Sequence, residues 1–69
     1  MARQRNAKMA SALAARGITG TELARRTGLS RGTITAVLNK RVVPTVVTRD
    51  MIADALGVTV KYLWPGMET

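Results

Sequence analysis

Apolar residues recur at intervals of three and four positions along most of the 69-residue chain, which is the spacing of one helix face. This spacing predicts five short helices, over about residues 6–16, 20–27, 31–39, 49–56 and 60–64. We therefore expect an all-α fold, a compact five-helix domain. The side chains expected to face inward are Met9, Ala10, Leu13, Ala14, Leu23, Ala24, Ile34, Val37, Leu38, Met51, Ile52, Ala55 and Leu56.

Residues that favour helix ends stand at the edges of these segments. In the stretch TGTE, Thr19 and Glu22 form a predicted capping box, in which Glu22 reaches back to the amide of Thr19. Asp50 is expected in the first turn of the fourth helix, where a carboxylate stabilises the helix dipole. The expected N-caps are Thr19, Ser30, Thr48 and Thr59, and the expected terminating glycines are Gly17, Gly28 and Gly57.

The stretch KRVVPTVV, residues 40–47, has the β-branched content of a strand. Pro44 removes a backbone donor, however, and the sequence offers no partner strand. We therefore expect a loop between the third and fourth helices.

Only three residues, Gly28 to Ser30, separate the second and third helices. So short a connection makes the helices cross steeply, and this predicts a helix-turn-helix over about residues 20–39. The small side chain of Ala24 suits the point of closest approach, and Gly28 suits a turn with positive φ. Leu29, with the apolar face of the third helix, fills the angle between the two helices.

The stretch TELARRTGLSRGTITAVLNKR resembles the λ-repressor-like (Cro/C1, XRE-type) helix-turn-helix family, and the resemblance covers about residues 6–64. The ending ALGVTVKYLWP is similar to the Ner-like branch of small phage DNA-binding regulators. The resemblance implies a five-helix fold, sequence-specific binding to duplex DNA, no catalysis and no cofactor or metal.

By position in that family, the third helix would lie in the major groove. The resemblance implies base contacts from Arg31, Gly32, Thr35 and Ala36. Arg31 is long enough to reach guanine O6 and N7, Gly32 permits close approach, and Ala36 suits a thymine methyl group. The expected backbone contacts are Gly20, Thr21, Ser30, Thr33, Asn39, Lys40, Arg41, Arg3, Arg5 and Lys8. Gly20 stands where many relatives have a phosphate-binding Gln, so only its amide is available.

The charge of the chain is concentrated in one half. Residues 1–41 hold nine of the eleven Lys and Arg and one acid, whereas residues 42–69 have a net charge of −1. Such asymmetry indicates a polyanionic partner, with duplex DNA favoured over an anionic membrane surface. Arg25 and Arg26 fit either a solvated helix face or contact with the DNA backbone.

Composition removes several classes of chemistry. The chain has no Cys and no His, so disulfides, thiolate metal sites and imidazole catalysis are absent. Asp50 and Asp54 lie one turn apart, but the sequence places no further acid–base residue beside them. No apolar run approaches the roughly 20 residues needed to cross a bilayer. We expect no enzyme and no small-molecule ligand.

Near the end of the chain, Tyr62, Leu63 and Trp64 leave two alternatives open. They either close the base of the helical bundle or belong to a dimer interface, where aromatic residues are enriched.

Together these features predict a DNA-binding transcriptional regulator, a repressor in the bacterial cytoplasm and nucleoid, which binds operator DNA. A homodimer, at least on DNA, and a monomer are the two alternatives for its oligomeric state. Residues 1–5 are expected to form a basic arm, 6–64 the domain and 65–69 a tail. Three rival hypotheses remain: a protein-interaction module such as an antitoxin or adaptor, a non-specific architectural DNA-binding protein, and a cationic helix at a membrane surface.

Overall fold

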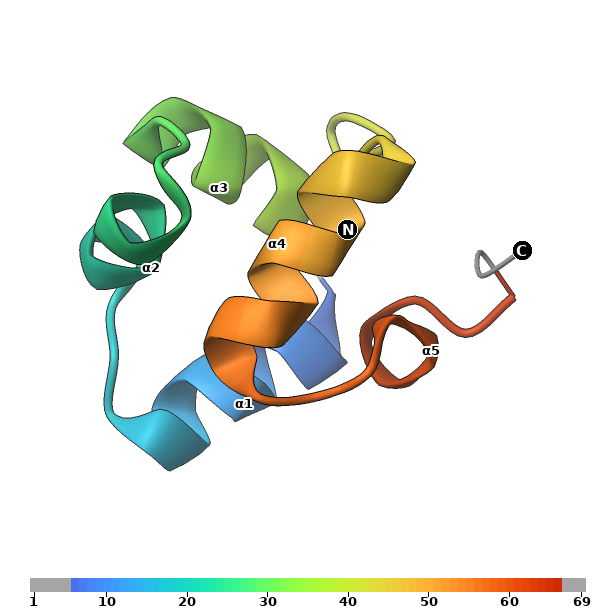
Figure 1. Cartoon of the computed structure of the whole chain (residues 1–69), viewed down its shortest axis with the longest axis horizontal. Helices are drawn as coiled ribbons and strands as arrows, with labels where there is room; N and C mark the ends of the chain where they lie inside the picture. Colours follow the sequence, from blue (N-terminus) through green and yellow to red (C-terminus); the bar gives the residue numbers. More distant parts are fainter. Residues whose placement is uncertain (1–5, 67–69) are drawn as a thin grey trace, which may run out of the picture.

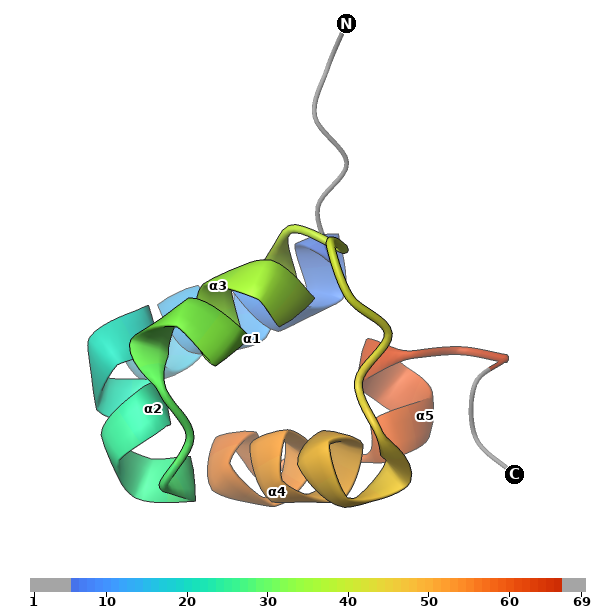
Figure 2. The same ribbon diagram turned by 90° about the horizontal axis from the view of Figure 1, so that it is seen from above.

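The computed structural model of the chain describes residues 6–66, and all regular structure within that range is helical. Five helices follow in the order α1 (Ala7–Arg16), α2 (Gly20–Thr27), α3 (Arg31–Leu38), α4 (Val46–Leu56) and α5 (Val60–Leu63). In Figure 1, α4 crosses in front, between α3 at the upper edge and α1 at the lower edge. In Figure 2, α4 lies on one side and α1 and α3 on the other, with α2 and α5 at the two ends. The expected all-α, five-helix architecture is confirmed.

The core lies where these helices meet. Its largest fully buried side chains are Met9, Leu23, Ile34, Ile52 and Leu56, and one comes from each of the first three helices and two from α4. Leu29, in the turn between α2 and α3, packs against this core, as expected. Because α3 buries Ile34 and Val37, its other side is left facing outward.

The start of α4 differs from the sequence prediction. The helix begins at Val46 rather than at residue 49, because the Thr45 hydroxyl, not that of Thr48, accepts from a first-turn amide. That amide belongs to Thr48, 3.2 Å away. Both threonines can cap a helix, and the chain uses the one that directly follows Pro44. Asp50 consequently lies in the second turn rather than the first.

Two of the predicted inward faces are also shifted. In α1 the buried residues are Met9, Ala12 and Leu13, whereas Ala10 is half-buried and Ala14 exposed. In α4 the buried residues are Arg49, Ile52, Ala53 and Leu56, which are spaced along one helix face. Arg49 is only 9% exposed, and its Nε is buried without a hydrogen-bond partner among the described residues. Met51 is half-buried, and Ala55 packs against the edge of the core.

Asn6 connects three parts of the fold. Its side-chain oxygen accepts from the Met9 amide at 3.0 Å and so caps α1. Its backbone N–H donates to the Leu38 carbonyl at the end of α3, at 2.8 Å. Its side-chain Nδ2 donates to the Leu63 carbonyl at the end of α5, at 3.0 Å. Because Asn6 is 5% exposed, water does not replace these bonds readily.

We expect Asn6→Ala to lower the free energy of unfolding by about 2–4 kcal/mol, measured by urea denaturation followed by circular dichroism. The loss combines a helix cap, about 1 kcal/mol, with an unsatisfied buried carbonyl of Leu63, about 1–3 kcal/mol. Thr45→Ala is the control, because it removes an exposed cap, together with an exposed bond to the Thr48 hydroxyl, and should cost about 1 kcal/mol. Equal losses in the two variants would show that the bond to Leu63 contributes nothing.

Candidate nucleic-acid interface

The outer face of α3 is set by its cap and by its buried side. Ser30 begins the helix, and its hydroxyl accepts from the Thr33 amide at 3.1 Å. Ile34 and Val37 are 1% and 2% exposed and hold the helix against the core. Of the four residues predicted to face bases, Arg31, Gly32 and Thr35 are exposed and Ala36 is half-buried. The structure thus brings all four to the outer side of one helix; their contact with DNA stays a prediction.

Gly32 is not required by the fold. A Cβ built there would have Ser30 Oγ at 3.9 Å as its only neighbour within 4 Å, which is ordinary van der Waals contact. Its φ is not positive, unlike that of Gly17, Gly28, Gly57 and Gly66. An alanine would fit and would stabilise the helix by up to about 1 kcal/mol. The folded chain therefore does not itself require glycine at this position.

Lys40, just after the other end of α3, has a backbone conformation that normally requires glycine. It is the one non-glycine residue with positive φ, 58°, in the part of the chain that the structure describes. Its N–H donates to the Val37 carbonyl at 3.1 Å, and the Arg41 N–H donates to the Ala36 carbonyl at 2.8 Å. This is a Schellman motif, which usually has glycine at the left-handed position. The ends of α1 and α4 use Gly17 and Gly57 there, so lysine at this place costs backbone stability.

The other predicted backbone-contacting residues surround these two positions. Thr21, Ser30 and Arg41 are exposed, while Gly20, Thr33 and Asn39 are half-buried. The Ser30 and Thr33 hydroxyls lie 2.9 Å apart and share one hydrogen bond, which leaves one hydroxyl proton for an outside acceptor. Arg3 and Arg5 lie outside the described residues. Asn6, which follows them directly, is bonded to the end of α3.

Lys8 has a partner of its own. Its Nζ lies 5.1 Å from the centre of the Tyr62 ring, within the range of a cation–π contact. Lys8 is nonetheless exposed, and it borders an open groove of about 500 Å³ together with Lys40. Two lysines from distant parts of the sequence therefore lie at one groove near the end of α3.

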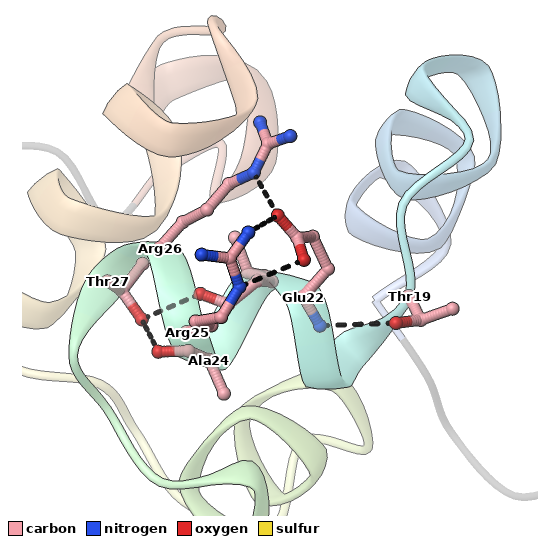
Figure 3. Close-up of polar contacts among 7 residues, drawn as sticks. Thr19, Glu22, Ala24, Arg25, Arg26 and Thr27 are labelled. Atoms are coloured by element: carbon pink, nitrogen blue, oxygen red, sulfur yellow. Dashed lines mark hydrogen bonds and ion pairs between the residues drawn. The ribbon is translucent and has the colours of Figure 1, made fainter.

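Arg25 and Arg26 are engaged by Glu22. Glu22 Oε2 lies 2.6 Å from Arg25 Nη2 and 2.9 Å from Arg26 Nε. In Figure 3 these three side chains lie on the side of α2 opposite the Ala24 methyl group. The hydrogen bond from Arg26, followed by that from Arg25, holds the pKa of Glu22 below its ordinary value. With their charge partly compensated, the two arginines fit a solvated helix face better than a DNA contact.

The same contacts correct the predicted capping box. Thr19 does cap α2, with its hydroxyl 3.1 Å from the Glu22 amide. The Glu22 carboxylate, however, turns forward to the arginines rather than back to the Thr19 amide (Figure 3). The two guanidinium groups offer the carboxylate full positive charges and three N–H donors, Arg25 Nε, Arg25 Nη2 and Arg26 Nε, whereas the Thr19 amide is one neutral donor.

Of the three residues considered for a dimer interface, two are inside the molecule. Leu63 is 2% exposed and Trp64 6%, because they close the end of the core beside Asn6. They are therefore unavailable to a partner, and the first of the two alternatives holds for them. Tyr62 is 44% exposed.

Two features near the end of α3 are not predicted by the sequence. Asn6 was included in the first helix, although asparagine directly before a helical segment is a strong N-cap signal. The left-handed conformation of Lys40 had no sequence signal, because asparagine or glycine is the residue normally expected there.

The short turn between α2 and α3 and the outward face of α3 are features of a helix-turn-helix. The chain belongs to the winged helix-turn-helix DNA-binding family, whose model matches residues 5–66. Within residues 6–66 the structure contains no strand, so the helix-turn-helix is present there without a β-hairpin wing. No curated protein and no solved structure matches the chain significantly. Among the described residues no helix is long and apolar enough to span a bilayer.

We expect Gly32→Ala and Lys40→Gly each to raise the free energy of unfolding, by up to about 1 kcal/mol, in urea denaturation. The first removes a flexible residue from a helix, and the second relieves a left-handed lysine. Gly28→Ala is the matched control: it puts a side chain at φ 77° and should destabilise by about 1 kcal/mol. Destabilisation by either of the first two variants would show that the fold itself requires Gly32 or Lys40.

Proposed function

We propose that the chain is a transcriptional regulator that binds duplex operator DNA sequence-specifically and acts as a repressor. The observation that carries the proposal is that two residues, Gly32 and Lys40, lower the local stability at the two ends of α3. Such departures from local preference are typical of functional positions rather than of structural ones. Both lie beside residues that can bind DNA, and the family match supports DNA as the partner.

In this proposal the N-terminal end of α3 enters the major groove. Arg31 donates two hydrogen bonds to guanine O6 and N7, and Gly32 allows the helix backbone to approach the base edges. Thr35 reaches a base edge or a phosphate, and Ala36 packs against a thymine methyl group. Because Gly32 and Ala36 have no hydrogen-bonding side chain, Arg31 supplies most of the direct readout.

Phosphates on either side are bound by cations and by amides at helix N-termini. Lys40 and Arg41 follow the recognition helix, and the amides of Gly20 and Thr21 lie in the first turn of α2. Arg3 and Arg5 reach the DNA from Asn6, and Ser30, Thr33, Asn39 and Lys8 contribute further contacts. With about six phosphates neutralised, the logarithm of affinity should fall with the logarithm of salt concentration with a slope of about −5.

The finer assignment also belongs to this proposal. The chain would be a λ-repressor-like regulator, close to the Ner-like phage proteins, acting in the bacterial cytoplasm on the nucleoid. It would repress by blocking polymerase, without cofactor, small-molecule ligand or catalysis, and would pair with a second copy on its operator.

Selection from a random duplex library, repeated at two salt concentrations, tests the proposal. The expected result is a short motif enriched at both concentrations, with lower overall affinity at the higher one. A protein that retains all duplexes equally would instead be a non-specific architectural protein. Retention of a partner protein with no DNA binding would identify an interaction module.

We expect Arg31→Ala to weaken binding to the selected sequence by about 5- to 150-fold in a competition mobility-shift assay, because it removes a bidentate base contact. Discrimination at one guanine should relax at the same time. Arg16→Ala is the charge-matched control: its guanidinium lies beside Gly57, at the end of α4, and the variant should bind almost normally. Unchanged affinity and site preference in Arg31→Ala would contradict the proposed readout.

The two stabilised variants are expected to bind DNA more weakly than the wild type, in the same assay. Gly32→Ala should lose affinity because its methyl group separates α3 from the base edges. Lys40→Gly should lose about one phosphate contact and reduce the salt slope by about 0.9. Once urea denaturation shows both variants to be at least as stable as the wild type, a loss of binding cannot be attributed to unfolding. Full binding by both would remove the main support for the proposal.

A further inference from the structure

The open groove bordered by Lys8 and Lys40 has an apolar base. Val37, Leu63 and Trp64 line it and are 2%, 2% and 6% exposed, which places them at its bottom. Most of the described residues that line it are apolar, and none of them is acidic. In Figure 2 the start of α1, the end of α3, the connection to α4 and α5 lie on the side of the molecule away from α2. We call the site that these segments form the lysine groove.

The rim of the lysine groove is positively charged. Lys8 and Lys40 are both exposed, and the ion pairs among the described residues all belong to Glu22, so neither lysine has an acidic partner there. The ring of Tyr62, 5.1 Å from the Lys8 Nζ, attracts that ammonium without neutralising it. The groove therefore combines an apolar base with two uncompensated cations.

These two properties define the chemistry of an occupant. An apolar base is covered by apolar side chains, whereas lysines at the rim attract carboxylates. The backbone of a duplex presents phosphates and would leave the base in contact with water. A second copy of this chain, with a net charge of +7, would be repelled. Because the groove is open, it suits a peptide segment better than a small molecule, most of whose surface a binding pocket encloses.

We infer that the lysine groove binds an acidic segment of a partner protein, with an apolar side chain of the segment against Trp64 and flanking carboxylates at Lys8 and Lys40. The volume of the groove, about 500 Å³, lies within the range of about 300–1,000 Å³ that is usual for ligand sites.

The regulatory consequence of this binding rests on the proposed function. Lys40 directly follows the C-cap of the recognition helix and is also a proposed phosphate contact. A segment that neutralises Lys40 therefore competes with the duplex, and by linkage each lowers the affinity of the other by the same factor. The partner protein thereby releases the chain from its operator.

The test begins with selection from a displayed library of short random peptides. The wild-type protein should enrich peptides in which Asp or Glu flank a large apolar residue. A synthetic peptide of the enriched sequence should then shift the amide NMR signals of Lys40, Val43 and Trp64, which line the groove. Enrichment of basic peptides, of uncharged peptides or of none would overturn the inference, as would shifts confined to α2.

Two substitutions remove the charge and the apolar surface separately. Lys8→Gln should weaken binding of the enriched peptide about fivefold, the upper end for an exposed ion pair, and the loss should disappear at high salt. Val43→Ser should weaken it about tenfold at any salt, because it removes apolar lining. Lys61→Gln and Val47→Ser are the matched controls, since both residues are exposed and neither lines the groove. Equal losses in the controls would place the peptide elsewhere on the surface.

The regulatory step is measured on the duplex motif that the protein selects. Saturating peptide should lower the affinity of the wild type for this duplex about tenfold, a typical coupling between sites. At the same peptide concentration Val43→Ser should lose much less, and without peptide it should bind the duplex like the wild type. Weaker duplex binding by Val43→Ser alone would assign the groove wall to DNA, and wild-type affinity unchanged by peptide would overturn the competition.

Failure of this inference is distinguishable from failure of the proposed function. If a duplex motif is selected but no acidic peptide is, only the inference fails. If no duplex motif is selected, the proposed function fails, while peptide binding, which is measured without DNA, still stands.

Discussion

Three hydrogen bonds of Asn6 connect the helices whose ends border the candidate nucleic-acid interface. They join the first turn of α1, the last carbonyl of α3 and the last carbonyl of α5, which are distant in sequence. Because Asn6 is buried, each bond contributes more than an exposed one would, and the loss of any leaves a polar group without water. One buried asparagine therefore fixes how the start of α1 and the end of α5 lie relative to the end of α3.

Local conformational stability is lowered where α3 and the residues that follow it face outward. Gly32 weakens the first turn of α3, Lys40 strains the residue after its C-cap, and the side chains of Val42 and Val43 are exposed just beyond. The same helix begins at a serine N-cap, and the residues that it buries, Ile34 and Val37, are apolar. This contrast separates what the helix needs in order to fold from what it presents to a partner.

The fold could be predicted well from the sequence because its signals are local. Helical spacing, cap-competent threonines and terminating glycines gave five helices and the short turn between α2 and α3. The errors arose where two local signals competed, as at Thr45 and Thr48, or where a side chain had two partners to choose between, as Glu22 did. The outward position of Gly32 and Thr35 follows from the apolar stripe of the same helix, and Arg31 lies at its N-terminal end. Long-range features could not be predicted: the bond between Asn6 and Leu63 spans 57 positions, and the conformation of Lys40 contradicts its residue type.

The burial of Trp64 gives the molecule a built-in optical reporter. It is the only tryptophan in the chain, it is 6% exposed, and it directly follows Leu63, whose carbonyl Asn6 holds. Its emission therefore reports whether the C-terminal helix is docked on the remainder of the domain. Detachment of that helix would expose the indole to water and shift its emission to longer wavelength. The circular dichroism signal of the other four helices would persist. Fluorescence and helicity that change together would indicate that the five helices melt as one cooperative unit.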